Sequence, residues 1–143
     1  MNDVQRPTVS AKRIAPLKAW FDAQGWTPLR FQREVWARWL DGESGLLHTP
    51  TGSGKTLAAF GGPLLDALDD AKRAGATKRK KNAPRTLRLL WITPLRALAT
   101  DTLRALREPV DALGLDWRIG LRTGDASARA RRLSRAPVNS MHW

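Results

Sequence analysis

The chain has 143 residues, of which 42% are hydrophobic, so it is long enough for about one domain and apolar enough to exclude global disorder. The absence of cysteine excludes a disulfide framework and a thiolate metal site. Residues 1–12 lack the apolar core of a signal peptide, and no run approaches the roughly 18 apolar residues of a membrane span. We therefore expect a cytoplasmic protein. Lys and Arg number 25 against 13 Asp and Glu, and this net charge of +12 favours a polyanionic partner, commonly nucleic acid, over a basic surface that is merely solvated.

The first part of the chain is predicted to be a polar arm followed by two helices. Residues 1–13 are polar, and we expect them to form a loose arm. Apolar residues at three- and four-residue spacing after Pro16 predict a short amphipathic helix that ends at Gly25. A second helix is expected from Pro28 to Asp41. Its apolar face consists of residues at helical spacing: Phe31, Val35, Trp36 and Trp39.

Residues 46–56, Leu-Leu-His-Thr-Pro-Thr-Gly-Ser-Gly-Lys-Thr, are predicted to bind a polyphosphate between a short strand and a helix. Gly52 and Gly54 can adopt backbone angles that point successive N–H groups at phosphate oxygens. A helix that starts near Lys55 adds its unpaired N–H groups, the Lys55 side chain can reach the β- and γ-phosphates, and the Thr56 hydroxyl can ligate magnesium. The predicted cofactor contacts are Gln32, Thr49, Thr51, Gly52, Ser53, Gly54, Lys55 and Thr56, with Lys55 also assigned a catalytic role.

This loop departs from the strict phosphate-loop pattern at one position. The pattern G-x-x-x-x-G-K-[ST] has glycine where this chain has Thr49. The simpler alternative is a Gly/Ser turn followed by an ordinary capped helix, but Gly-Lys-Thr after an apolar run favours phosphate binding. The sequence Thr-Pro-Thr-Gly-Ser-Gly-Lys-Thr resembles the first motif of superfamily-two helicases of the DEAD/DEAH-box kind, which implies ATP and Mg²⁺ as cofactors.

Residues 28–32 resemble a second element of those helicases, the Q motif. There, a glutamine four residues after a proline reads the adenine edge, which implies the same role for Gln32. An amide can donate to adenine N7 and accept from its N6 amino group, so it suits adenine and not guanine. The alternative is a solvent-facing helix residue. The family also stacks an upstream aromatic ring on the base, and the candidates for it are Trp20, Phe21 and Trp26.

After the loop, a helix is expected from Lys55 to about Arg73, kinked or split at Gly61-Gly62-Pro63. Eight basic residues and no acidic one lie between Lys72 and Arg88, which predicts a mobile surface loop. This basic loop would either contact phosphates or only increase solubility.

Residues 87–93 are predicted to be a buried strand of a parallel sheet, followed by a long helix. The Pro94-Leu95-Arg96-Ala97-Leu98-Ala99 segment resembles motif Ia of the same helicases, which implies that Pro94 and Arg96 contact nucleic-acid phosphates. The alternative is a plain strand-to-helix turn with an exposed arginine. The inner face of the helix is expected to carry Leu98, Leu103, Leu106 and Val110.

Residues 116–121 predict a third strand, which ends in Arg122-Thr123-Gly124-Asp125. In the family, a glycine-bearing loop after this strand also touches nucleic acid, which implies contacts from Arg122, Thr123 and Gly124. The alternative is that Asp125 or a nearby serine caps a following helix.

Together these segments are similar in order and spacing to the first RecA-like domain of a DEAD/DEAH-box helicase. The amino-acid sequences of these segments resemble those of the large helicase-related branch, in particular the ligase-associated DEXH-box helicases of bacterial DNA repair. The resemblance implies an α/β fold: a partial RecA-like P-loop domain, with a parallel sheet covered by helices on both faces and preceded by two helices. It covers about residues 14–132, the N-terminal part of the helicase ATP-binding domain, and residues 133–143 form an atypical tail.

The family would continue with an Asp-Glu-x-His box and a second RecA-like domain, and neither is in this sequence. We therefore expect the chain to be a truncated part of an ATP-dependent DNA helicase that binds ATP and nucleic acid, DNA in preference to RNA, without turnover; whether it is an enzyme stays open. The alternatives are a non-catalytic binding module and another P-loop NTPase, and Thr49 and Gln32 disfavour the latter.

Overall fold

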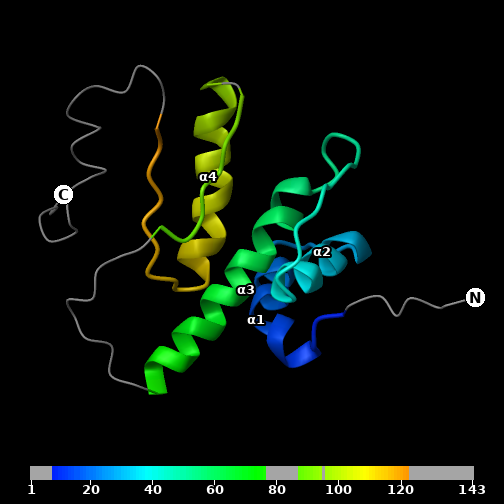
Figure 1. The fold of residues 1–143 in the computed structure, drawn as a ribbon, viewed down its shortest axis with the longest axis vertical. Helices are drawn as coiled ribbons and strands as arrows, with labels where there is room; N and C mark the ends of the chain where they lie inside the picture. The colour runs from blue at the N-terminus through cyan, green and yellow to red at the C-terminus, as the bar shows by residue number, and fades with distance from the viewer. Residues whose placement is uncertain (1–7, 77–86, 95, 123–143) are drawn as a thin grey trace, which may run out of the picture.

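The computed structural model describes residues 8–76, 87–94 and 96–122 of the chain. Its helices are α1 (Ala11–Ala23), α2 (Arg30–Leu40), α3 (Lys55–Ala76) and α4 (Arg96–Ala112), shown in Figure 1. The long helix α3 is the central element, because α1, α2 and α4 all pack against it. Within the described ranges, no helix has the length and apolar character to cross a membrane.

Helix α1 starts earlier than the sequence predicted and ends where it predicted. The Ser10 side chain accepts a backbone hydrogen bond from the first turn, so the helix begins before Pro16 and includes it. At the other end Gly25 has a φ of 73°, and the Trp26 N–H donates to the Phe21 carbonyl at 2.9 Å. This is a Schellman motif, and it turns the Trp26 ring edge-on toward Phe21 at a centroid distance of 6.2 Å.

The contact between α2 and α3 explains the glycine pair that the sequence predicted would kink or split the helix. Helix α3 runs unbroken through Gly61, Gly62 and Pro63. A Cβ on Gly61 would lie 2.2 Å from Trp36 Nε1, and one on Gly62 would lie 2.6 Å from the Trp39 side chain. The glycines therefore serve helix packing, because the missing side chains let two indoles of α2 approach the α3 backbone.

Helix α4 buries part of the face that the sequence predicted. Leu106 and Val110 are buried in the core as expected, and Leu103 is partly buried. Leu98, which was expected on the same face, has 48% of its surface exposed. The apolar stripe of α4 is therefore buried toward the C-terminal half of the helix.

Three segments outside the helices, residues 44–50, 87–94 and 115–122, run as extended chain and point toward the same end of the molecule (Figure 1). Partly buried side chains of the last two segments, including Trp91 and Trp117, pack against the core. Both indoles meet the buried Phe60 ring of α3 edge-on, with centroid distances of 6.4 and 6.2 Å. The last two segments are thus attached to α3 mainly through side chains.

The predicted parallel sheet with helices on both faces, and with it the α/β fold class, is wrong for the part of the chain that the structure describes: the helices there are accompanied by no β-strand. A ladder requires neighbouring backbones about 4.7–4.9 Å apart with paired N–H and C=O groups. Among the described residues, backbone hydrogen bonds outside the helices lie at helix ends and turns. In the segment 87–94, apolar residues on one side of the chain pack on the helices. Those on the other side are exposed, with Leu90 at 70% and Ile92 at 81%.

Candidate phosphate-binding site

The loop between residues 44–50 and α3 has backbone angles that suit phosphate binding. Gly52 and Gly54 have φ values of 78° and 84°, in the left-handed region that favours glycine. The Gly54 carbonyl accepts the first helical hydrogen bond, from the Ala58 N–H at 3.0 Å. Helix α3 therefore begins at Lys55, and its unpaired N–H groups and positive dipole end lie at the loop.

Lys55 holds this loop in a closed shape. Its Nζ donates to the carbonyls of Thr49 and Pro50, each at 2.7 Å. The hydroxyl groups of Thr49 and Ser53 are 2.6 Å apart and bond across the loop. An ammonium group has three donors, so phosphate oxygens can take up the remaining N–H or replace the two carbonyls. Thr49 therefore has a structural role at the position where the strict pattern has glycine.

Gln32 connects α2 to this loop and is not the solvent-facing residue of the alternative interpretation. Its side chain is 3% exposed. Its Oε1 accepts from the Leu29 N–H at 2.8 Å, and its Nε2 donates to the Gly54 carbonyl at 3.1 Å. A Cβ on Gly54 would lie 2.7 Å from that Nε2, so a side chain at position 54 would displace the amide. Gln32 and the loop are thus in direct contact.

Among the aromatic candidates for stacking on a base, the structure distinguishes one. Trp20 and Phe21 are 8% and 2% exposed, whereas Trp26 is 46% exposed. Trp26 lies in the segment between α1 and α2, directly after Gly25. Of these three residues, only Trp26 is therefore exposed enough to be within reach of a flat ligand.

The predicted magnesium ligand, Thr56, is the second residue of α3 and is partly buried, and Thr51 is exposed on the loop. A hydroxyl at this place and the oxygens of a bound triphosphate are the ligands that the site could offer to magnesium. The described residues contain no cluster of three or more His, Cys, Asp or Glu side chains placed to hold a metal ion.

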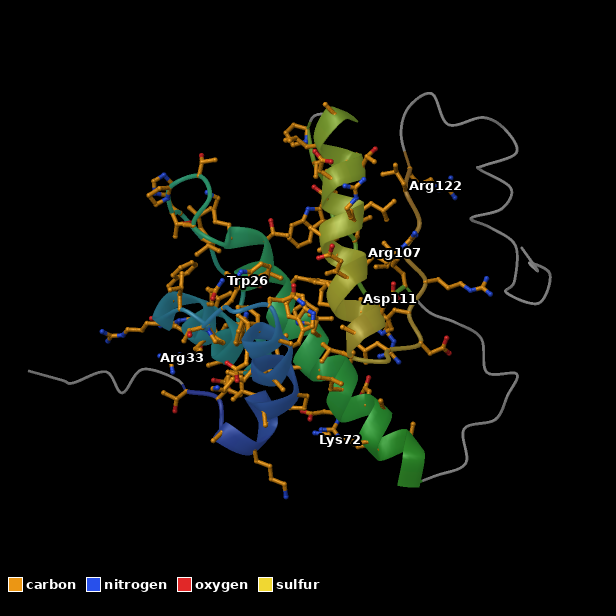
Figure 2. All side chains as sticks on the ribbon, turned by 180° about the vertical axis from the view of Figure 1, so that it is seen from behind. Trp26, Arg33, Lys72, Arg107, Asp111 and Arg122 are labelled. Carbon is orange, nitrogen blue, oxygen red and sulfur yellow. The ribbon has the colours of Figure 1, made fainter. Side chains whose placement is uncertain are left out.

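The predicted nucleic-acid contacts lie apart from this loop. Pro94 ends the second extended segment and Arg122 ends the third, and both are exposed. Figure 2 shows Arg122 on the extended chain beside α4. The side chain of Arg96, at the start of α4, lies outside the described residues, as do Thr123 and Gly124.

Sequence reasoning missed the role of Trp36, which was assigned only to the apolar face of its helix. Its ring is fully buried, and its Nε1 donates to the Leu57 carbonyl in the first turn of α3 at 3.0 Å. The only sequence signal for this contact is the Gly61-Gly62 pair, which a tryptophan on a neighbouring helix can use.

A glycine loop closed by a lysine at a helix start, with a glutamine bonded to the loop, defines a nucleotide-binding class of protein. The family model for the DEAD/DEAH box helicase matches residues 29–141, so the chain belongs to that family. The family predicted from the phosphate loop, the Gln32 segment and the Pro94 segment is thereby confirmed.

Several of the proteins similar to this chain are Lhr-type helicases. The chain is similar to the Lhr helicase/uracil glycosylase of Escherichia coli (strain K12), with 37% identity over 130 residues, which is 82% of this chain and 8% of that protein. It is also similar to the ATP-dependent helicase Lhr-Core of Saccharolobus solfataricus, with 41% identity over 88 residues, or 57% of this chain and 9% of that protein. The chain thus spans less than a tenth of these relatives. No solved structure matches it.

Proposed function

We propose that this chain binds ATP and magnesium through residues 49–56 and binds single-stranded nucleic acid, as the nucleotide-binding part of an Lhr-like ATP-dependent helicase. The observation that carries the proposal is the loop itself. Gly52 and Gly54 occupy the left-handed region, and Lys55 stands at the start of α3 with its ammonium group inside the loop. Backbone N–H groups, a helix dipole and a fixed cation are then available to one polyphosphate.

Gln32 and Trp26 support adenine as the base. The Gln32 amide makes two hydrogen bonds to the protein, which leaves one N–H and one lone pair for the adenine edge. Trp26 is 46% exposed and is the aromatic residue that we propose stacks on the base. A purine with a 6-amino group suits the free donor and acceptor of Gln32, and a guanine does not.

Titration calorimetry with Mg-ATP and Mg-GTP tests the nucleotide proposal. We expect the wild-type chain to prefer ATP and Lys55→Ala to lose binding of both nucleotides, because the replacement removes the cation from the loop. Gln32→Ala should keep triphosphate binding but lose most of the preference for ATP. Equal affinity of wild type and Lys55→Ala for ATP would contradict the phosphate-loop assignment.

DNA is the nucleic acid that we favour. The name of the Escherichia coli relative joins a helicase to a uracil glycosylase, an activity on a base that is foreign to DNA, which supports a role in DNA repair. One relative of 35% identity, from Aspergillus oryzae, is named an RNA helicase, so the choice requires a direct comparison of the two nucleic acids. The net charge of +12 supports phosphate contacts of either kind.

A further inference from the structure

Helix α2 makes two side-chain hydrogen bonds to the start of α3. Gln32 donates to the Gly54 carbonyl at 3.1 Å, and Trp36 donates to the Leu57 carbonyl at 3.0 Å. The two donors are four residues apart on α2 and therefore lie on one face of the helix. The two acceptors stand on either side of residues 55–56, to which the proposed function assigns the phosphate and magnesium contacts.

The Trp36 contact fixes the position of α2 along α3. The indole is fully buried and occupies the space that the missing Gly61 side chain leaves. In a regular α-helix the Leu57 carbonyl accepts from the N–H four residues later, so the indole uses its second lone pair. A shift of α2 would leave a buried indole N–H without an acceptor, which is unfavourable.

We propose that Trp36 is a positioning residue for the nucleotide site, because its indole N–H holds the first turn of α3 at a set place relative to Gln32. This inference rests on the proposed ATP site. Without the N–H, the ring would still fill the space beside Gly61, but α2 could move along α3 and Gln32 would no longer meet the loop and the base together. ATP binding and the preference for ATP should then weaken together.

The experiment compares two tryptophan variants of the full chain, Trp36→Phe and Trp39→Phe. Both lose an indole N–H and keep an aromatic ring on α2 against a glycine of α3. In the part of the chain that the structure describes, the Trp39 indole makes no hydrogen bond, so Trp39→Phe is the matched control. The readouts are the calorimetric Kd values for Mg-ATP and Mg-GTP, with the thermal midpoint measured alongside.

For Trp36→Phe we expect the Kd for ATP to rise about three- to tenfold, the effect of one lost hydrogen bond, and the ratio of ATP to GTP affinity to fall. Trp39→Phe should change neither quantity, whatever its effect on the midpoint. Wild-type affinity and selectivity in Trp36→Phe, or equal weakening in both variants, would overturn the inference. ATP binding that survives Lys55→Ala would instead overturn the proposed function, and the inference with it.

A measurement on the wild type covers the case in which Trp36→Phe does not fold. In a proton–nitrogen correlation spectrum, the Trp36 indole signal should be protected from solvent exchange and should shift when Mg-ATP is added. The Trp39 indole is 42% exposed at the residue level and should exchange quickly and respond little. A Trp36 indole signal that does not respond to saturating Mg-ATP would overturn the inference.

Discussion

Gly54 combines two requirements that usually fall on different residues. Its φ of 84° is unfavourable for any residue with a side chain, at a cost of about 1–3 kcal/mol. Its missing side chain also leaves room for the Gln32 amide, whose Nε2 lies 2.7 Å from the place of a Cβ. Gly52 has a similar φ of 78°, but no atom lies within 4 Å of its Cβ position. A side chain at position 52 would therefore add backbone strain alone, whereas a side chain at position 54 would add strain and also clash with Gln32.

Alanine at these two positions should lower the free energy of unfolding by different amounts. We expect Gly54→Ala to cost about 1–3 kcal/mol more than Gly52→Ala, because it also displaces a buried, hydrogen-bonded amide. Urea denaturation of both variants measures the difference. In a Gln32→Ala background the extra cost should largely disappear, and equal costs in the wild-type background would show that the contact with Gln32 contributes nothing.

At the scale of elements, the packing of Trp91 and Trp117 on Phe60 connects two extended segments to the central helix. Phe60 is 1% exposed and meets both indoles edge-on. Edge-on aromatic pairs contribute about 0.5–1.5 kcal/mol beyond the buried area. Since the described residues have no sheet ladder, side-chain contacts of this kind hold the two segments in place.

Phe60→Ala should therefore lower the free energy of unfolding by about 3–5 kcal/mol, the range for a buried phenylalanine. The near-ultraviolet circular dichroism of the tryptophans should weaken in the same variant. Leu98→Ala is the control on α4, because Leu98 is 48% exposed and a surface change of this kind costs within about 0.5 kcal/mol. A Phe60→Ala chain as stable as the wild type would mean that the two segments are held by other contacts.

The sequence predicted the helices and the loop better than it predicted the strands. Helical spacing of apolar residues and a glycine stop located α1, α2 and α3, because these signals are local. The dense apolar run at residues 87–93 has the pattern of a buried strand, yet Leu87, Leu90 and Ile92 are largely exposed. Local sequence patterns do not predict whether two distant segments pair through their backbones. They also do not predict the hydrogen bond from Trp36 to the Leu57 carbonyl.

At the scale of the whole molecule, exposed arginines lie on opposite sides. Figure 2 shows Arg122 on the extended chain beyond α4, and Arg33 on α2 at the other side of the molecule. Both side chains belong to exposed residues. If single-stranded nucleic acid binds at the ends of the extended segments, these two arginines should differ in their contribution although they carry the same charge.

We expect affinity for oligo-dT, measured by fluorescence anisotropy, to fall steeply with salt. Arg122→Ala should reduce the slope of log K against log salt by about 0.7, the value for one phosphate contact on a single strand. Arg33→Ala removes the same charge and should leave the slope unchanged. Equal slopes of log K against log salt for the two variants would mean that binding depends on net charge alone. Tighter binding of oligo-U than of oligo-dT would contradict the choice of DNA.

If ATP binds as proposed, the closed loop makes the carbonyls of Thr49 and Pro50 competitors of the nucleotide. These carbonyls hold the Lys55 ammonium at 2.7 Å each, so under the proposed function a phosphate that takes over these two N–H groups would enter by exchange. The number of hydrogen bonds can stay constant in this exchange, but bonds to ionised oxygens are about twice as strong as bonds to neutral ones. In that case the carbonyls would return to Lys55 when the phosphate departs. The residence time of the nucleotide would therefore depend on two backbone groups that never touch it.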